Sequence, residues 1–222
     1  MKVAVLTPSR GLIHSRMAEA VERNMHGIGL SMGDQGRSWQ RFSSHDKPIP
    51  ASHVYCLQEA LAWCPDWYWI VEEDIVPPDL TLAQMIEAIR FAGPAVITAR
   101  YYDHGGCTDY HLNANGILQY AGVGCVLFSH QTMQALQQTP RELFQNNLDW
   151  KFPDDEFGKP SPKSHGFRDG LYGGLDVHFW AQVHLRKIPA LLSEQWVEHW
   201  ELVKLGAKNQ NDGCHEMRPI KP

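Results

Sequence analysis

Short apolar runs alternate with segments of helical periodicity through about the first hundred residues of the chain. Continuous apolar runs, the pattern of strands buried on both faces, occupy residues 3–6, 67–71 and 95–99. Apolar residues at helical spacing follow Ser15, Ser52 and Thr81, with Ser52 as an expected N-cap and Thr81 and Gln84 as an expected capping box. This alternation predicts a mostly parallel sheet covered by helices on both faces.

The pattern is less regular elsewhere. Residues 27–50 are expected to be a loop region with one short strand, residues 101–128 to be strands and turns, and residues 138–172 to be irregular. Apolar spacing predicts a helix from about Leu175 to Leu185, followed by a strand at 188–192. The chain from Lys204 onward is polar and is expected to be a mobile tail.

Composition narrows the class of protein. A chain of 222 residues with 43% hydrophobic content can bury a sizeable core. A formal charge of −5 gives no overall positive field for nucleic acid or an anionic membrane. The five cysteines include no CxxC and fit reduced thiols. With no apolar run long enough for a signal or a membrane span, we expect a soluble, cytoplasmic protein without a membrane partner.

Three adjacent carboxylates, Glu72, Glu73 and Asp74, follow the apolar run at 67–71 directly. Such acids repel one another and are costly to desolvate, and a shared cation relieves both costs. Oxygen ligands suit Mg²⁺ or Mn²⁺, which proteins commonly share with the phosphates of a substrate. The cluster therefore indicates a metal–nucleotide site at the end of a central strand; a solvated acidic turn is the alternative.

Two further polar clusters follow predicted strands, where ligands of an open parallel sheet usually bind. Thr7, Pro8, Ser9 and Arg10 offer hydroxyls, backbone N–H groups and a guanidinium to a nucleotide. There is neither a P-loop nor a dinucleotide-binding glycine motif, so a simple turn remains the alternative. The other cluster is Glu198-His199. His199 could complete a metal shell that Asp74 begins, although a lone histidine more often has no ligand role.

One carboxylate and two tryptophans complete the candidates. Asp176 follows two glycines at the start of a predicted helix, where it fits either an N-cap or a general base for an acceptor hydroxyl. Trp196 and Trp200 flank His199 and could stack on a sugar or a base.

In order and spacing these segments resemble the GT-A glycosyltransferases of the family-2-like group, which use nucleotide-sugar donors. The matching segments are Val3–Arg10, Gln58–Ala62, Ile70–Leu80, Gly122–Phe128, Gly174–Phe179 and Glu198-His199. The resemblance covers about residues 1–200 and implies one α/β domain of the GT-A type at 1–203, a mostly parallel sheet flanked by helices. Its Rossmann-like nucleotide-binding half would be 1–100 and its acceptor half 101–203, with 204–222 as a tail and candidate lid.

The resemblance also implies roles for the donor-side residues. Asp74, with His199, would bind Mn²⁺ or Mg²⁺, which stabilises the charge that grows on the leaving diphosphate. Glu72 would contact the donor ribose or a metal-bound water, and Glu73 would bind the donor together with Thr7, Pro8, Ser9 and Arg10. The motif reads Glu-Glu-Asp, which leaves the division of labour among the three acids open.

On the acceptor side, the resemblance implies that Asp176 deprotonates the acceptor hydroxyl in an inverting displacement. Leu175 stands where the family usually has the first acid of a Glu-Asp pair, a departure that bears on both the base and the stereochemistry. The other acceptor-side residues would be Gly124, Gly174, Trp196 and Trp200.

A UDP-sugar is the expected donor. The alternatives are a nucleotidyltransferase that activates sugars and a non-catalytic nucleotide- or glycan-binding protein of the same fold. Residues 8–16 are also similar to small bacteriophage glycosyltransferases, some of which modify hydroxymethylated pyrimidines in DNA, in the host cytoplasm. A DNA acceptor requires a basic patch, such as Arg37, Arg41 and Lys47, or Lys151, Lys159, Lys163 and Arg168; solvated loops are the alternative, and the negative net charge counts against DNA.

Overall fold

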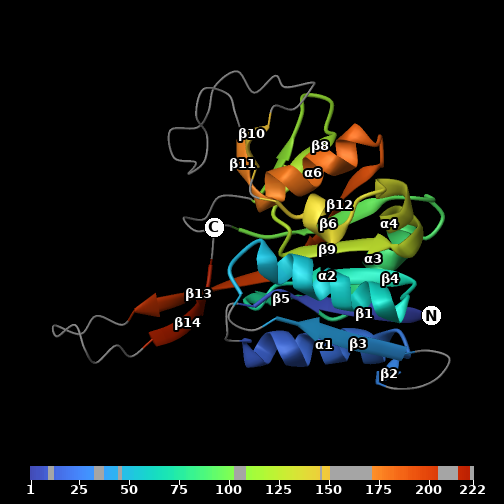
Figure 1. Ribbon diagram of the computed structural model, residues 1–222. Coiled ribbons are helices and arrows are strands. Elements are labelled where there is room, and N and C mark those ends of the chain that lie inside the picture. Colours follow the sequence, from blue (N-terminus) through green and yellow to red (C-terminus); the bar gives the residue numbers. More distant parts are fainter. Residues whose placement is uncertain are drawn as a thin grey trace.

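The computed structural model of the protein describes residues 1–9, 13–32, 38–44, 47–102, 109–145, 147–150, 172–204 and 215–220. For 31–32, 147–150, 172–173, 201–204 and 215–217 it describes the backbone alone. The main feature is a seven-stranded sheet with helices on both faces (Figure 1).

The central sheet has the strand order β12-β6-β9-β4-β1-β3-β2. Its strands are β1 (Lys2–Thr7), β2 (Ser31–Met32), β3 (Ser38–Ser43), β4 (Trp67–Val71), β6 (Val96–Arg100), β9 (Cys125–Ser129) and β12 (Ala190–Trp196). All neighbours are parallel except β9, which is antiparallel to β4 and β6 on its two sides. The predicted class, a mostly parallel α/β sheet flanked by helices, is therefore confirmed.

The helices are α1 (Ser15–Gly27), α2 (Ala51–Trp63), α3 (Thr81–Ile89), α4 (His130–Leu136), α5 (Pro140–Leu143) and α6 (Leu175–Leu185). Successive side chains of a strand point to opposite faces, so each central strand supplies two cores. On β1, Ala4 and Leu6 pack with α2, α4, α5 and α6, whereas Val3 and Val5 pack with α1 and α3. This burial on both faces explains why the strands appear in the sequence as continuous apolar runs.

Three small sheets are attached to this core. The strands are β7 (Tyr110–Leu112) with β8 (Leu118–Ala121), β10 (Asn147–Trp150) with β11 (Tyr172–Gly174), and β5 (Ile75–Val76) with β13 (Glu198–Lys204) and β14 (His215–Pro219). The β13–β14 ribbon reaches away from the main body in Figure 1. Residues 215–219, which we expected to belong to a mobile tail, thus form a strand paired with β13.

The predictions for individual helices, strands and caps are confirmed only in part. The helices from Ser15 and Leu175 are confirmed, but residues 27–50 contain two strands rather than one, and both extend the sheet beyond β1. The two predicted caps are wrong. Pro50 precedes α2 without a side-chain cap, and Leu80 precedes α3. Asn24 of α1 accepts the hydrogen bond of the Leu82 N–H at 2.9 Å, a cap supplied by another helix.

The segment before β9 is tightly packed around its glycines. A Cβ on Gly122 would lie 1.8 Å from the Tyr101 hydroxyl and 1.9 Å from a carboxylate oxygen of Asp109. We predict that Gly122→Ala lowers the free energy of unfolding by roughly 1–3 kcal/mol in a denaturant titration, because a rigid buried ring must move. Gly27→Ala, whose Cβ would meet only the flexible end of exposed Leu80, is the control and should not destabilise. Equal stability of Gly122→Ala and wild type would contradict this packing.

Candidate metal and nucleotide site

The parallel pairing of β1 with β4 places the loop after β1 beside the three acids. Both strands end at the same edge of the sheet, and their following residues are linked by side chains. The Ser9 hydroxyl donates to Glu73 at 2.6 Å, and the Ser9 N–H donates to the Ser44 hydroxyl at 3.2 Å. The His14 N–H donates to the Glu73 carbonyl at 3.1 Å. The predicted meeting of these two clusters is therefore present.

The pairing of β5 with β13 brings the late histidine to the same place. His199 is opposite Ile75 in the ladder, and the Trp200 N–H donates to the Asp74 carbonyl at 2.9 Å. As a result the Nε2 atom of His199 lies 3.5 Å from a carboxylate oxygen of Asp74. The two residues that the sequence suggested as metal ligands, far apart along the chain, are thus in direct contact.

The orientation of His199 is set by its other ring nitrogen. Its Nδ1 lies 2.9 Å from the Tyr102 carbonyl, which can only accept, so Nδ1 carries a proton. In the neutral ring Nε2 is then unprotonated and faces Asp74, the arrangement that a metal-binding histidine requires. Burial opposes the imidazolium, but the contact with Asp74 and its negative charge outweigh that effect and raise the pKa of His199 to about 8.

A narrow cleft opens between the loop after β1, the start of α2 and the three acids. It is lined by Pro8, Ser9, Ile49, Ser52, His53, Glu72, Glu73 and Asp74. Thr7, also predicted here, is fully buried at the end of β1. The Nε2 atom of buried His53 lies 3.1 Å from Glu72, a contact that sequence reasoning missed because a single histidine on a helix has no ligand spacing.

Asp176 reaches the same region from the opposite half of the sheet. One carboxylate oxygen accepts the Val123 N–H at 3.0 Å. The Gly124 N–H donates to the Tyr101 hydroxyl at 3.1 Å, and the Gly124 carbonyl accepts the Glu72 N–H at 2.9 Å. The short turn before β9 therefore joins the acid motif to Asp176.

The predicted N-cap role of Asp176 is wrong. Gly174 is the N-cap of α6, at φ +113°, a conformation that other residues rarely adopt, and Asp176 lies within the first turn. Its carboxylate is thus directed to the turn before β9 instead of capping its own helix, while it remains near the positive end of that helix.

The two candidate tryptophans differ in their surroundings. Trp200 is buried and packs against the His14 ring at 4.8 Å and the Arg16 guanidinium at 4.7 Å, so little of its surface is open to a ligand. Trp196 is 38% exposed and stacks on Tyr102 at 4.7 Å, next to the carbonyl that holds His199. Of the two, only Trp196 offers open aromatic surface.

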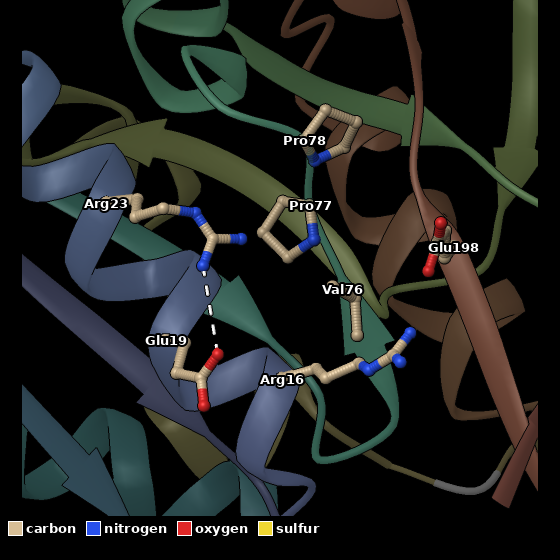
Figure 2. A pocket seen from close by; sticks show the side chains of 7 residues that line it. All are labelled: Arg16, Glu19, Arg23, Val76, Pro77, Pro78 and Glu198. Atoms are coloured by element: carbon tan, nitrogen blue, oxygen red, sulfur yellow. Dashed lines mark ion pairs between the residues drawn. The ribbon is translucent and has the colours of Figure 1, made fainter.

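A second, wider groove lies between α1, the end of β5 and the start of β13. Figure 2 shows Arg16, Glu19 and Arg23 of α1 facing Val76, Pro77, Pro78 and Glu198 across it. Arg23 pairs with Asp79 at 2.8 Å and with Glu19 at 3.9 Å. The positive charges of the arginines in this groove are balanced by neighbouring carboxylates, so the groove is not a basic patch.

The basic residues proposed for DNA fall largely outside the described residues. Arg10 of the donor loop, Arg37, Lys151, Lys159, Lys163 and Arg168 all lie outside them. Arg41 is half-buried, donates to the Ala18 carbonyl and packs near Trp39, and burial lowers its pKa. Lys47 lies over the Tyr55 ring.

The chemistry of the donor atoms fits a divalent cation that a ligand helps to hold. Within the described ranges, no three His, Cys, Asp or Glu side chains form a cluster that could bind a metal alone. Asp74 and His199 would supply two ligands, and phosphates and water the remainder, which is usual for ions shared with a nucleotide. An imidazole ligand disfavours Mg²⁺, a hard ion that prefers oxygen, and leaves Mn²⁺ as the better fit.

Comparison with known proteins shows a similarity of fold. No family model and no curated protein matches the chain. Among solved structures, A197 from STIV has a TM-score of 0.58 at 15% identity over 90% of this chain and 86% of that one. The observed sheet and this likeness agree with the predicted fold class in its coarser form, a mostly parallel α/β sheet flanked by helices.

Two further solved structures have lower scores. A 4-diphosphocytidyl-2C-methyl-D-erythritol synthase from Anaerococcus prevotii has a TM-score of 0.33 at 7% identity, over 61% of this chain and 74% of that one. A provisionally named nucleotide-diphospho-sugar transferase from Desulfovibrio desulfuricans has 0.37 at 10% identity, over 88% and 79%. At these TM-scores neither similarity supports a conclusion about the fold or the activity.

None of the helices in the described part of the chain combines the length and apolar character needed to cross a bilayer. The described cysteines, Cys56, Cys64 and Cys125, are free thiols.

The Asp74–His199 contact predicts a specific pH dependence of stability. A group whose pKa is higher in the folded state contributes its full stabilisation of the fold below its unfolded pKa, here 6.5. This contribution is lost as the pH rises through the folded pKa of about 8. With a chelator present, wild type should lose about 2 kcal/mol of unfolding free energy relative to His199→Gln between about pH 6 and pH 9. Parallel stability curves for the two proteins, measured by urea titration, would contradict it.

Proposed function

We propose that the protein is a metal-dependent glycosyltransferase that moves a sugar from a nucleoside-diphosphate sugar to an acceptor hydroxyl. The observation that supports this most strongly is the contact of Asp74 with His199 at 3.5 Å, beside a cleft formed by Ser9 and the acid motif. A UDP-sugar is the proposed donor and Mn²⁺ the proposed ion.

The residues present would divide the work as follows. Asp74 and His199 would hold the ion, which stabilises negative charge on the departing diphosphate. Ser9 orients Glu73 through its 2.6 Å hydrogen bond and so shapes the wall of the cleft. Glu72 would accept hydrogen bonds from the donor ribose.

Asp176 is the proposed general base. The Val123 N–H donates to one of its oxygens at 3.0 Å, which fixes the carboxylate against the turn whose Gly124 carbonyl accepts the Glu72 N–H. A base on the acceptor side of the sugar would remove the proton of the acceptor hydroxyl as that oxygen attacks, which gives inversion at the anomeric carbon. Trp196 would offer its exposed surface to the acceptor. Gly124 and Gly174 are the other proposed acceptor-side residues.

The acceptor itself is defined only by chemistry, a hydroxyl that can approach Asp176. Hydroxymethylated pyrimidines in DNA are one class of acceptor to be tested. The paired charges of the α1 groove give no support for phosphate binding there. A nucleotidyltransferase is the competing activity, and it is separable because it would release pyrophosphate instead of a nucleoside diphosphate.

Metal and nucleotide binding should depend on the same two residues. In calorimetric titrations of UDP, GDP and CDP, one nucleotide should bind only with Mn²⁺, and Asp74→Asn or His199→Gln should weaken it at least roughly tenfold. Asp66→Asn, which changes the carboxylate next to the opposite end of β4, is the matched control and should bind as wild type. Unchanged binding in both site variants would remove the proposed metal site.

Loss of the base should separate turnover from binding. Asp176→Asn should lower kcat roughly 10²–10⁴-fold over a panel of acceptor hydroxyls, because an amide cannot take the proton. Affinity for the nucleotide with Mn²⁺ should stay unchanged and serves as the internal control. A variant that turns over as fast as wild type would exclude Asp176 as the base.

A further inference from the structure

A buried histidine of α2 faces the first of the three acids. His53 is 1% exposed, and its Nε2 atom lies 3.1 Å from a carboxylate oxygen of Glu72. The chemistry proposed above does not use this residue. A polar ring buried this completely is costly unless it has an electrostatic or hydrogen-bonding partner.

The ring of His53 is held in place on its other sides. Its ring contacts Phe144 in a tilted arrangement with 5.2 Å between ring centres, and its Nδ1 lies 3.4 Å from the Ser52 hydroxyl. Within the described residues Nε2 forms no hydrogen bond of good geometry, and its contact with the Glu72 carboxylate at 3.1 Å is electrostatic. The histidine is thus held with Nε2 beside Glu72.

Glu72 is in turn fixed through its backbone. Its N–H donates to the Gly124 carbonyl at 2.9 Å, and its carbonyl accepts the Ile75 N–H at 3.2 Å. The side chain is 26% exposed and lines the cleft. Its carboxylate therefore touches a buried histidine on one side and the open cleft on the other, which is the position of a group presented to a ligand.

A carboxylate held in this way recognises hydroxyl groups. It only accepts hydrogen bonds, and the 2′- and 3′-hydroxyls of a ribose are adjacent donors that one carboxylate can accept together. An acid that accepts from a ribose hydroxyl is a known device of nucleotide sites in parallel sheets. A free Glu72 could rotate away, whereas the contact with His53 restricts it to one orientation.

We infer that His53 is a positioning residue that holds Glu72 for the ribose hydroxyls and so makes the cleft select ribonucleotides over deoxyribonucleotides. The inference rests on the proposed function, because it takes the cleft as the donor site. His53 itself touches neither the phosphates nor the metal ligands Asp74 and His199 in this account.

The first test needs no mutation. Wild-type protein with Mn²⁺ is titrated calorimetrically with UDP, 2′-deoxy-UDP and 3′-deoxy-UDP, and with the same series for GDP and CDP. For the base that binds, loss of the hydroxyl that Glu72 accepts should weaken binding roughly tenfold to a hundredfold, as expected for a hydrogen bond to a charged group.

The second test assigns the selectivity to His53. His53→Leu keeps an apolar filling beside Phe144 but has no polar atom, so the preference for the ribonucleotide should fall by roughly tenfold with unchanged affinity for the deoxy form. His53→Gln retains an N–H donor and should restore much of the preference. His26→Leu, at an exposed histidine of α1, is the matched control and should behave as wild type.

The outcomes separate this inference from the proposed function. If no diphosphate binds with Mn²⁺, the donor site and with it the inference are wrong. If ribose and deoxyribose forms bind equally, or if His53→Leu weakens both equally, the donor site stands and the role of His53 is refuted. Selective loss of the ribose preference in His53→Leu, rescued in His53→Gln, is the result that supports it.

Discussion

The contact between Asp74 and His199 depends on the short antiparallel pairing of β5 with β13. Two residues of β5 are enough to place the carboxylate of Asp74, which follows β4, against the imidazole of His199 in β13. The Tyr102 carbonyl fixes the proton on Nδ1 and leaves Nε2 for Asp74. Without a cation, Asp74 raises the pKa of His199 and so favours a proton on Nε2 between the two side chains; a metal ion would take the place of that proton.

The turn before β9 is the second constraint, because it links Asp176 to the backbone of the acid motif. Its amides hold Asp176 and contact Tyr101, and its carbonyl holds the backbone of Glu72. Burial raises the pKa of Tyr101 well above its usual range, so its hydroxyl stays neutral and can both donate and accept. The close approach of this ring leaves room only for glycine at position 122. A shift in this turn would move both carboxylates together.

Much of this arrangement could be predicted from the sequence, since strands buried on both faces leave continuous apolar runs and their ends carry the polar clusters. The meeting of Ser9 with the acids follows from the parallel pairing of β1 with β4, which the alternation of elements favours. The contact of His199 with Asp74 needs the pairing of β5 with β13, which the alternation of elements does not indicate. The caps could not be predicted, because the cap of α3 comes from Asn24 on another helix. His53 was missed for the same reason. Its partner Glu72 is brought to it only by tertiary packing, and nothing in the local sequence marks it.

The central claim is that one divalent cation binds between Asp74 and His199 and joins the protein to the diphosphate of its donor. The most direct measurement is a crystal structure with Mn²⁺ and UDP, with data collected where manganese scatters anomalously. The account predicts one anomalous peak in contact with an Asp74 oxygen, His199 Nε2 and the diphosphate, at bond lengths of roughly 2.0–2.3 Å. A peak elsewhere, or bound UDP with the Asp74–His199 contact intact and no metal between them, would contradict it.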